Sequence, residues 1–413
     1  MVIRSFNVSF FDLRHLGNRT ELKPIFYKIM IKATKSFMML AGMAMAFSAC
    51  NSNKETAQTT LSGLDPQNFV AEYDGRPTAL YTLKNANGME VCVTNFGGRI
   101  VSVMVPDRNG DFKDVVLGFD SVQAYFPENN LSDFGASIGR YANRINQGRI
   151  VIDGDTIQLP QNNFGHCLHG GPTGWQYKVY AAEQPNDSTV VLTIDSPDGD
   201  NNFPGNVKAQ VTYTLTPDNA IDIAYKATTD KQTYVNMTNH SYFNLNGDPN
   251  QPITDNILSI NATRYTPVDS TYMTTGEILE VKDTPMDFTV AKVVGDDIDR
   301  FDFVQLKNGN GYDHNWVLDT NRDDSQVAAT LYSPATGIQL EVLTDEPGIQ
   351  VYSGNVLDGT VTGKHGVTYR QRTGICLETQ KYPDTPNKPE WPSALLKPGE
   401  TYSSHCVFRF SVK

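Results

Sequence analysis

Short runs in which hydrophobic and polar residues alternate make up most of the chain after residue 66. A period of two is that of a β-strand with one buried face, and β-branched and aromatic residues dominate these runs. Turn-forming pairs such as Asn87-Gly88, Asn109-Gly110 and Asp153-Gly154 separate them. The clearest predicted strands span residues 91–94, 100–105, 190–194, 207–215 and 221–225.

Long segments with a helical period of 3.6 are lacking, so the chain shows no alternation of strands and helices. It is therefore no candidate for a Rossmann fold or a TIM barrel. Many antiparallel strands need a second sheet to bury their apolar faces. No linker, composition shift or short repeat interrupts residues 66–413, and we predict one large all-β domain there, an antiparallel sandwich.

The segment from Tyr234 to Leu245 has two chemically different faces when it is read as a strand. One face is mainly apolar, and the other carries His240 among amides, hydroxyls and aromatic rings. Rings can cover the apolar faces of a sugar, amides can meet its hydroxyls, and a histidine can move a proton near neutral pH. The segment favours a wall of a sugar pocket, and a half-exposed surface strand with a stray histidine is the alternative.

The N-terminal part of the chain is not expected to belong to this domain. Lys32 and Lys35 precede an apolar run over residues 37–47 that is too short for a membrane span and suits a signal peptide. Small residues and Cys50 follow, which resembles a bacterial lipoprotein processing site. We predict an over-extended start and signal peptide over 1–49, lipidation of Cys50 after export, and a polar tether over 50–65. A cytosolic protein with an apolar N-terminal helix is the alternative.

Composition narrows the choice of ligand. The formal net charge is -12 and the pI is near 5.0, which argues against a nucleic-acid surface and favours a small neutral ligand or a cation. Beyond Cys50 the cysteines match no CxxC pair and no zinc pattern. We predict that they are buried free thiols, namely Cys92, Cys167, Cys376 and Cys406.

Four further segments carry unusual polar residues. Asn143 and Arg144 offer an amide beside a five-donor guanidinium, although such a loop is often only solvated. His169 lies beside glycines that permit close backbone approach to a ligand, without a metal-ligand pattern. Asp313 points away from the flanking Tyr312 and Trp316, with a turn carboxylate as the alternative. Glu378 ends an apolar strand that would desolvate it, raise its pKa and make it a better base, unless the strand end is solvated.

The chain resembles the aldose 1-epimerases, or galactose mutarotases, from about Phe69 to Phe410. The motifs that carry the resemblance occur in family order, at residues 114–120, 139–145, 168–171, 198–205, 238–245, 312–315 and 377–380. It implies a β-supersandwich fold and interconversion of the α and β anomers of free aldoses such as galactose and glucose, feeding hexose metabolism. It also implies that the chemistry requires no cofactor or metal.

By the same resemblance Glu378 is the catalytic base and His240 the catalytic acid. The sugar hydroxyls would be held by Asn143, Arg144, His169 and Asp313, and Ser241 and Tyr242 would flank the acid. This chain departs from the family where His166 precedes the Leu-His-Gly-Gly element and where residues 200–202 are less acidic. Neither departure touches the proposed acid or base, so they bear on sugar preference rather than on the reaction.

Other functions remain open at this point. A glycoside hydrolase or lyase of related fold would need two opposed carboxylates, with Glu378 and Asp313 as the available pair. A non-catalytic sugar-binding lipoprotein would bind sugars without accelerating mutarotation. The acidic loop over 195–200 could hold Ca²⁺, but it lacks EF-hand spacing and a solvated turn is the simpler interpretation. We expect a monomer that meets the membrane only through Cys50.

Overall fold

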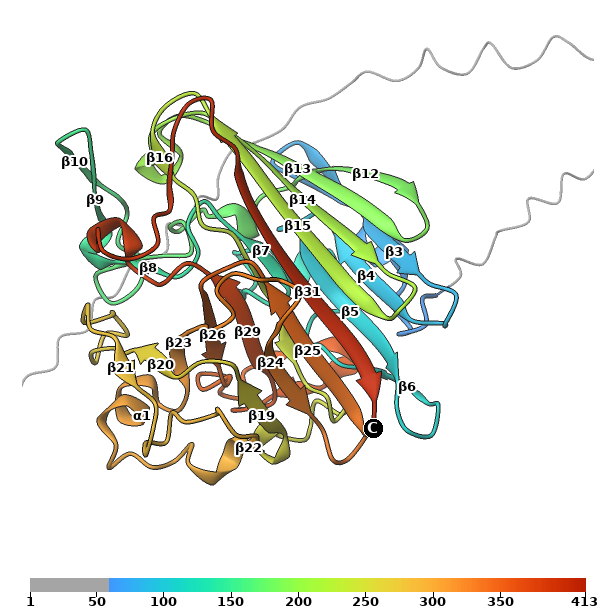
Figure 1. The fold of residues 1–413 in the computed structure, drawn as a ribbon. Coiled ribbons are helices and arrows are strands. Elements are labelled where there is room, and N and C mark those ends of the chain that lie inside the picture. The colour runs from blue at the N-terminus through green and yellow to red at the C-terminus, as the bar shows by residue number, and fades with distance from the viewer. Residues whose placement is uncertain (1–58) are drawn as a thin grey trace, which may run out of the picture. The chain divides into compact units, whose positions relative to one another are not determined.

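The computed structural model describes residues 59–413 (Figure 1). The predicted signal peptide with Lys32 and Lys35, the lipidation site Cys50 and most of the tether lie outside these residues. Over the described range, no helix is long and apolar enough to span a membrane.

One layer of the domain is a nine-stranded antiparallel sheet, seen as the long diagonal strands in Figure 1. The C-terminal strand β31 lies at its centre, between β15 and β25. The order across the sheet is β12 (Ala181–Asn186), β13 (Thr189–Ser196), β14 (Val207–Leu215), β15 (Ala220–Thr229), β31 (Tyr402–Val412), β25 (Ile338–Thr344), β24 (Val327–Tyr332), β19 (Ile257–Ile260) and β22 (Lys292–Val293).

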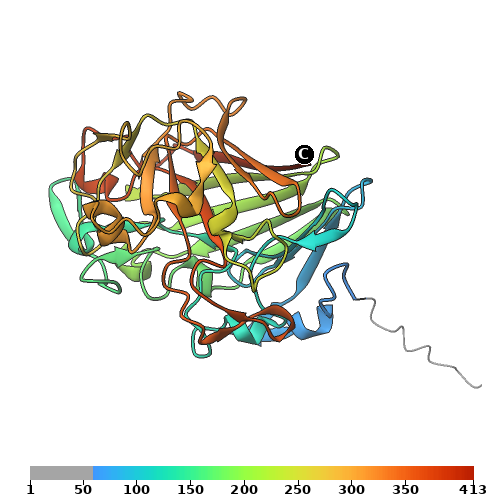
Figure 2. The same cartoon turned by 90° about the horizontal axis from the view of Figure 1, so that it is seen from below.

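Two smaller antiparallel sheets pack against this layer (Figures 1 and 2). The first has four strands, β3 (Leu80–Lys84), β4 (Glu90–Thr94), β5 (Arg99–Pro106) and β6 (Phe112–Asp114). The second has six, in the order β18 (Tyr242–Phe243), β29 (Ile375–Gln380), β26 (Gly348–Tyr352), β23 (Asp313–Val317), β20 (Arg264–Thr266) and β21 (Leu279–Glu280).

A single buried cluster joins all three sheets. It contains Val93 from β4, Tyr213 from β14, Val351 from β26 and Phe408 from β31, each of them at most 1 % exposed. Buried residues alternate with partly exposed ones along β14 and β31, as the burial of one face requires, whereas every residue of β4 and β26 is buried. The sandwich is therefore held by the period-two pattern that is visible in the sequence.

Six further ladders of the described residues have two strands each. They are β1 (Ala71–Tyr73) with β2 (Arg76–Thr78), β7 (Ala136–Ile138) with β17 (Thr238–His240), β8 (Arg144–Ile145) with β11 (Cys167–Leu168), β9 (Arg149–Ile152) with β10 (Asp155–Gln158), β16 (Thr233–Tyr234) with β30 (Leu395–Leu396), and β27 (Val361–Thr362) with β28 (Thr368–Tyr369). The α-helix α1 (Val304–Gly309) is the one α-helix in the described part of the chain.

The predicted all-β sandwich is confirmed, and the five clearest predicted strands correspond to β4, β5, β13, β14 and β15. The predicted turn at Asp153-Gly154 joins β9 to β10, and both residues have positive φ, 53° and 89°. Positive φ at both central residues is the requirement of a tight turn that matches the strand twist. The four cysteines outside the N-terminal segment are buried free thiols, as predicted.

The segment 234–245 differs from the single strand that its alternation suggested. It forms the three short strands β16, β17 and β18, which pair with β30, β7 and β29. Alternation persists locally, because Val235, Met237 and Phe243 enter the central core cluster. On the polar face, Tyr234 packs in a separate apolar cluster, and the side chain of Asn236 bonds backbone groups instead of facing a pocket.

The last residues of the predicted tether pack on the domain. Leu64 is 1 % exposed, and the backbone N–H of Leu61 donates to Glu90 Oε1 at 2.6 Å. Leu64 belongs to a second buried apolar cluster, together with Phe69 and Phe96. Burial of its apolar side chain stabilises the packing of this stretch on the domain. The described part of the tether, from Thr60 to Leu64, thus packs on the domain.

Candidate active site

A cavity of about 200 Å³ opens beside the six-stranded sheet. Residues from distant parts of the sequence line it, and among them are seven of the eight predicted site residues, Asn143, Arg144, His169, His240, Tyr242, Asp313 and Glu378. Four aromatic rings, those of Phe164, Tyr242, Tyr272 and Tyr352, share the lining with these polar groups. Rings beside amides and charged groups suit a polyol ligand.

The register of the six-stranded sheet explains why several of these side chains meet. Residues paired across neighbouring strands project from the same face, so each row of pairs faces one way. One row is Tyr242, Cys376, Tyr352 and Asp313, and the parallel row two residues on contains Glu378 and Gln350. The alternate residues Leu377, Val351 and Trp316 enter the core. The predicted opposition of Asp313 to Trp316 is thereby confirmed.

His240 reaches the same cavity from a different ladder. It ends β17, where it pairs with Ala136 of β7. Its Nε2 lies 3.6 Å from Glu378 Oε1, and its Nδ1 lies 3.4 Å from Cys376 Sγ. The ring of Tyr242 stacks on the imidazole with centroids 5.1 Å apart. The two predicted proton carriers are therefore neighbours although 138 residues apart in sequence (378 − 240).

Burial moves the proton affinities of this pair toward each other. Glu378 is 2 % exposed, and its pKa is raised well above the usual range by desolvation, then by the charges of Asp313 and Asp133. Desolvation also lowers the pKa of His240 below 6.5. A carboxyl and an imidazole with similar proton affinity can pass a proton in either direction at little cost. Glu378 Oε2 has no hydrogen-bond partner among the described residues, which leaves it ready to accept from a ligand hydroxyl.

Asn143, Arg144 and His169 form a second wall. The backbone N–H of Asn143 donates to His169 Nδ1 at 3.2 Å, which leaves the Nε2 of that ring for the cavity. The guanidinium of Arg144 lies over the ring of Tyr272, 4.9 Å from its centre, and its Nε donates to Asn163 Oδ1. Asn143 and His169 both have positive φ, 63° and 50°, a conformation rare outside glycine and asparagine that often marks functional sites.

Asp313 lies across the cavity as a partly desolvated carboxylate. Its Oδ1 accepts from Gln350 Nε2 at 2.7 Å. Burial raises the pKa of Asp313, and the charge of Arg144 opposes that rise. A carboxylate held by one amide keeps acceptor capacity for sugar hydroxyls.

Ser241 is the predicted site residue that the structure does not bring to the cavity. Its side chain is buried on the opposite side of the chain from His240 and Tyr242, and its Oγ has no hydrogen-bond partner among the described residues. Alternation along an extended segment is the reason, because neighbours at odd and even positions face opposite ways. Ser241 is next to the acid in sequence, but its side chain does not line the cavity, and its proposed role at the sugar stays a prediction.

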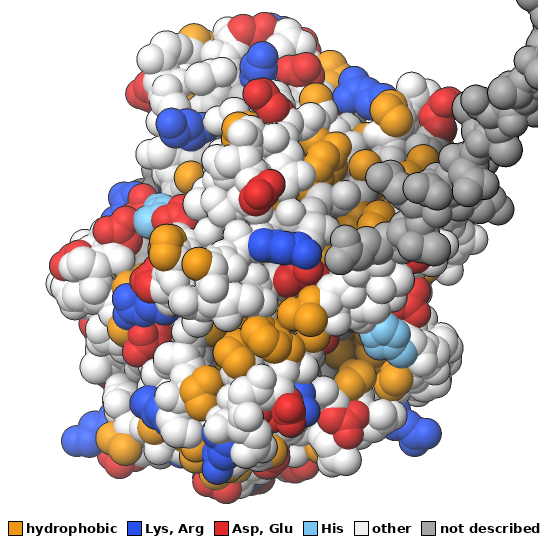
Figure 3. Space-filling model, turned by 90° about the vertical axis from the view of Figure 1, so that its right-hand side faces the viewer, with side chains coloured by type: hydrophobic (Ala, Val, Ile, Leu, Met, Phe, Trp, Pro, Cys, Tyr) orange, Lys and Arg blue, Asp and Glu red, His pale blue; other side chains and the backbone are white. Residues whose placement is uncertain are grey.

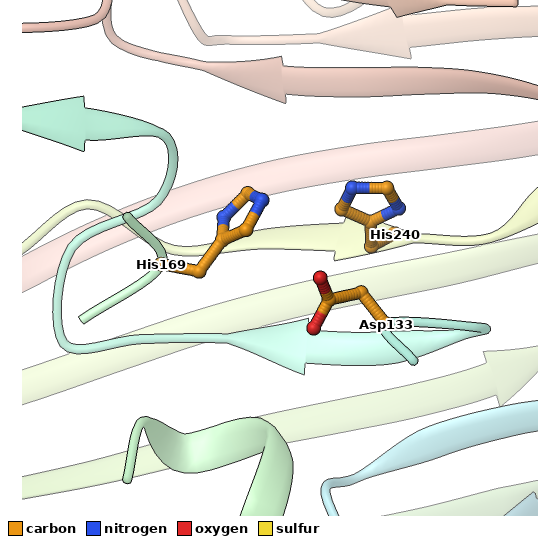
Figure 4. A group of neighbouring side chains, drawn as sticks. All are labelled: Asp133, His169 and His240. Carbon is orange, nitrogen blue, oxygen red and sulfur yellow. The ribbon is translucent and has the colours of Figure 1, made fainter. Parts of the chain in front are cut away.

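Sequence reasoning missed Asp133, which precedes β7 and lines the cavity. One oxygen of Asp133 and one nitrogen each of His169 and His240 lie within 4.8 Å of one another (Figure 4). A single aspartate in a loop gave no signal, since no motif surrounds it. Tyr272, under Arg144, was missed for the same reason.

Two other candidate ligand groups are engaged elsewhere. His166 does not line the cavity, because its Nδ1 accepts from the backbone of Gln147 and its Nε2 meets Thr271 Oγ1. In the acidic loop over 195–200, Asp198 and Asp200 pair with Lys231 and Lys178, each at 2.6 Å. The suggested Ca²⁺ site remains a prediction, and these lysine pairs weigh against it.

Comparison with known proteins gives a consistent result. The sequence model of a family described as "Aldose 1-epimerase" matches residues 79–409. The chain is 39 % identical over 339 residues to the aldose 1-epimerase of Escherichia coli K12, covering 82 % of this chain and 96 % of that protein. It is 40 % identical over 324 residues to the galactose mutarotase of Homo sapiens, covering 78 % and 92 %.

Solved structures show the same fold. The galactose 1-epimerase of Lactobacillus acidophilus superposes with a TM-score of 0.73 at 29 % identity, covering 83 % of this chain and 97 % of that one. An aldose epimerase homologue from C. elegans gives the same TM-score and identity, covering 81 % and 99 %.

Proposed function

The chain belongs to the aldose 1-epimerase family, and from that membership we infer that it interconverts the α and β anomers of free aldoses such as galactose and glucose. The observation that carries the mechanism is the pair of buried proton carriers, Glu378 and His240, 3.6 Å apart in a cavity of about 200 Å³. We assign Glu378 as general base and His240 as general acid.

Ring opening moves two protons. The carboxylate of Glu378 takes the proton of the anomeric hydroxyl, and that O–H electron pair forms the carbonyl bond at C1. The bond from C1 to the ring oxygen breaks, and the ring oxygen takes a proton from the imidazolium of His240. Rotation about C1–C2 and the reverse transfers then close the ring as the other anomer. Since both oxygens are bonded to one carbon, an acid and a base in contact can serve both.

The opposite pKa shifts of the pair favour ring opening. Before opening the pair is carboxylate and imidazolium, and after opening it is carboxylic acid and neutral imidazole. Burial raises the pKa of Glu378 and lowers that of His240, which stabilises the neutral pair of the opened state relative to the buried ion pair. Both anomers open and close through the same two protonation states.

Polarimetry tests the function directly. Freshly dissolved α-galactose and α-glucose should reach their equilibrium rotation faster with the protein, and the added rate should saturate with sugar concentration. Saturable sugar binding without acceleration would instead favour the non-catalytic lipoprotein. Release of reducing ends from an oligosaccharide would favour a hydrolase.

On the face shown in Figure 3, basic and acidic side chains are interspersed, so that face has no concentrated basic surface for nucleic acid.

Asp313→Ala should chiefly weaken sugar binding. The carboxylate lies across the cavity from the acid, and it takes no proton in the reaction. Loss of a hydrogen bond to a charged group costs about 1.5–3 kcal/mol, so KM should rise roughly 10-fold to 100-fold while kcat changes much less. Initial polarimetric rates over a range of galactose concentrations measure both constants. Asp302→Ala, at an exposed carboxylate, is the control, and a fall in kcat at constant KM would contradict this role.

We also propose that the protein is exported and anchored through a lipid on Cys50. The support is the run of lysines, apolar residues and small residues that precedes this cysteine. Thr60, ten positions after Cys50, is already buried in the domain. Cys50→Ser should abolish incorporation of labelled palmitate in a bacterial host and move the protein from the membrane to the soluble fraction. Cys92→Ser is the control, and membrane retention of Cys50→Ser would refute the anchor.

A further inference from the structure

Asp133 lies in the catalytic cavity with a free acceptor. Its carboxylate, His169 and His240 form the compact group of Figure 4, in which one donor atom of each lies within 4.8 Å of the others. Asp133 Oδ1 is buried and has no hydrogen-bond partner among the described residues. Over the same range, no lysine or arginine nitrogen lies within 4.0 Å of this carboxylate. No ion pair therefore neutralises the carboxylate within the described residues, although the buried guanidinium of Arg99 also interacts with its charge.

Backbone hydrogen bonds join the segment that bears Asp133 to the strand that bears His240. The N–H of Gly135 donates to the carbonyl of His240 at 3.0 Å, and the next residue, Ala136, pairs with His240 across the β7–β17 ladder. The N–H of Ala136 also donates to the carbonyl of Asp133 at 3.0 Å. Arg99 Nη1 donates to the carbonyl that follows Asp133, at 2.9 Å. The carboxylate and the imidazole are thus carried by one hydrogen-bonded unit.

Gly135 makes this connection tight. Its φ is +69°, and a Cβ at this position would lie 1.9 Å from the carbonyl oxygen of Ile100. Only glycine fits such a close approach with positive φ. The loop that bears Asp133 consequently packs closely between β5 and His240.

We propose that Asp133 is the charge partner of His240. It is a positioning residue that stabilises the protonated imidazole and so favours the protonated form of the catalytic acid. This inference rests on the proposed function, because it assigns a purpose to a charge beside the proposed acid. Glu378 already serves as the base of the pair, so a second carboxylate can stabilise the imidazolium without taking part in the proton transfer. Asp133 takes no proton in the proposed reaction.

Electrostatics of the cavity agree with this geometry. Desolvation is the largest influence on His240 and lowers its pKa, whereas Asp133 is the largest influence that raises it and Arg99 lowers it further. Asp133 also raises the pKa of Glu378. The other groups that face His240 or share its cavity are the charged Arg144 and Asp313, His169, the rings of Tyr242 and Tyr352, and the thiol of Cys376.

The expected signature is a displacement of the pH dependence. Asp133→Asn keeps the shape and removes the charge, so the pKa of His240 should fall and the alkaline limb of kcat should move to lower pH. The pKa of Glu378 should also fall, and the acid limb should move the same way. For a partly exposed charge roughly 5 Å away, a shift of about one pH unit is expected.

The test combines kinetics with a direct titration. Rates of α-galactose mutarotation are measured between pH 5 and 9 for the wild type, Asp133→Asn and the conservative Asp133→Glu. EDTA is present throughout to remove adventitious metal ions. The imidazole of His240 is titrated in parallel by NMR with labelled histidine, and its signal is assigned by its absence in His240→Asn. Asp358→Asn, an exposed carboxylate outside this cavity, is the matched charge control.

The proposal is supported if Asp133→Asn lowers the titration midpoint of His240 and both limbs, Asp133→Glu restores them at least partly, and Asp358→Asn leaves them in place. An unchanged midpoint overturns it, whether the variant raises KM alone, as a simple sugar contact would, or slows the rate equally at every pH, as a structural defect would. If the wild type accelerates no mutarotation, the proposed function fails, while the NMR titration still decides whether Asp133 controls His240.

Discussion

Glu378→Gln should lower kcat for the anomerisation of α-galactose or α-glucose by at least about 10²-fold. General-base catalysis typically contributes at least this much, which corresponds to roughly 3 kcal/mol of activation free energy. The amide keeps the shape of the side chain but cannot accept the anomeric proton. Its neighbours in the cross-strand rows, Gln350 and Cys376, are undisturbed, so sugar binding should change much less than kcat.

Stability separates this loss from misfolding. Because burial raises the pKa of Glu378 well above its unfolded value, the folded state binds that proton more tightly. The contribution of Glu378 to stability is therefore present at low pH and is lost as pH rises through the folded pKa. A neutral glutamine avoids that loss, and Glu378→Gln should melt no lower than the wild type near neutral pH.

Polarimetry and thermal melts of the same samples measure both effects. Glu280→Gln makes the same change at an exposed position in β21, the edge strand of the same sheet, and should leave the rate unchanged. A Glu378→Gln enzyme with a near wild-type rate would refute the assignment of the base.

His240→Asn should produce a loss of similar size, at least about 10²-fold in kcat. Asparagine removes the group that protonates the ring oxygen, and the 3.6 Å approach of Nε2 to Glu378 disappears with it. Residual activity should also lose the alkaline limb that the deprotonation of His240 imposes on the wild type. The pH dependence of the polarimetric rate measures both effects.

The control for this variant is His365→Asn. His365 is exposed and has a φ of 55°, a conformation that asparagine tolerates well, so the change should be neutral. The double variant Glu378→Gln/His240→Asn should be about as slow as the slower single variant, because groups that act as one unit lose their effect together. Multiplied losses in the double variant would show that the two residues do not act on one proton path.

Several site residues could be identified from local sequence. Glu378 belongs to an apolar strand that buries it, and the alternation around Asp313 correctly opposed it to Trp316. In the segment 234–245, alternation puts Ser241 opposite His240 and Tyr242, and its buried side chain does not line the cavity. Asp133 could not be found in this way, since nothing near it in sequence relates it to His240.

The sequence by itself determined the strand-rich architecture, the turns and which face of each strand is buried, because these depend on a period of two between near neighbours. It also carried the motifs from which the family and the acid–base pair were named. Only the tertiary structure decided that β16, β17 and β18 separate, that Glu378 meets His240, and that Asp133 lies beside both histidines of the cavity. Those outcomes depend on pairing register between strands more than a hundred residues apart, and no local period encodes such a register.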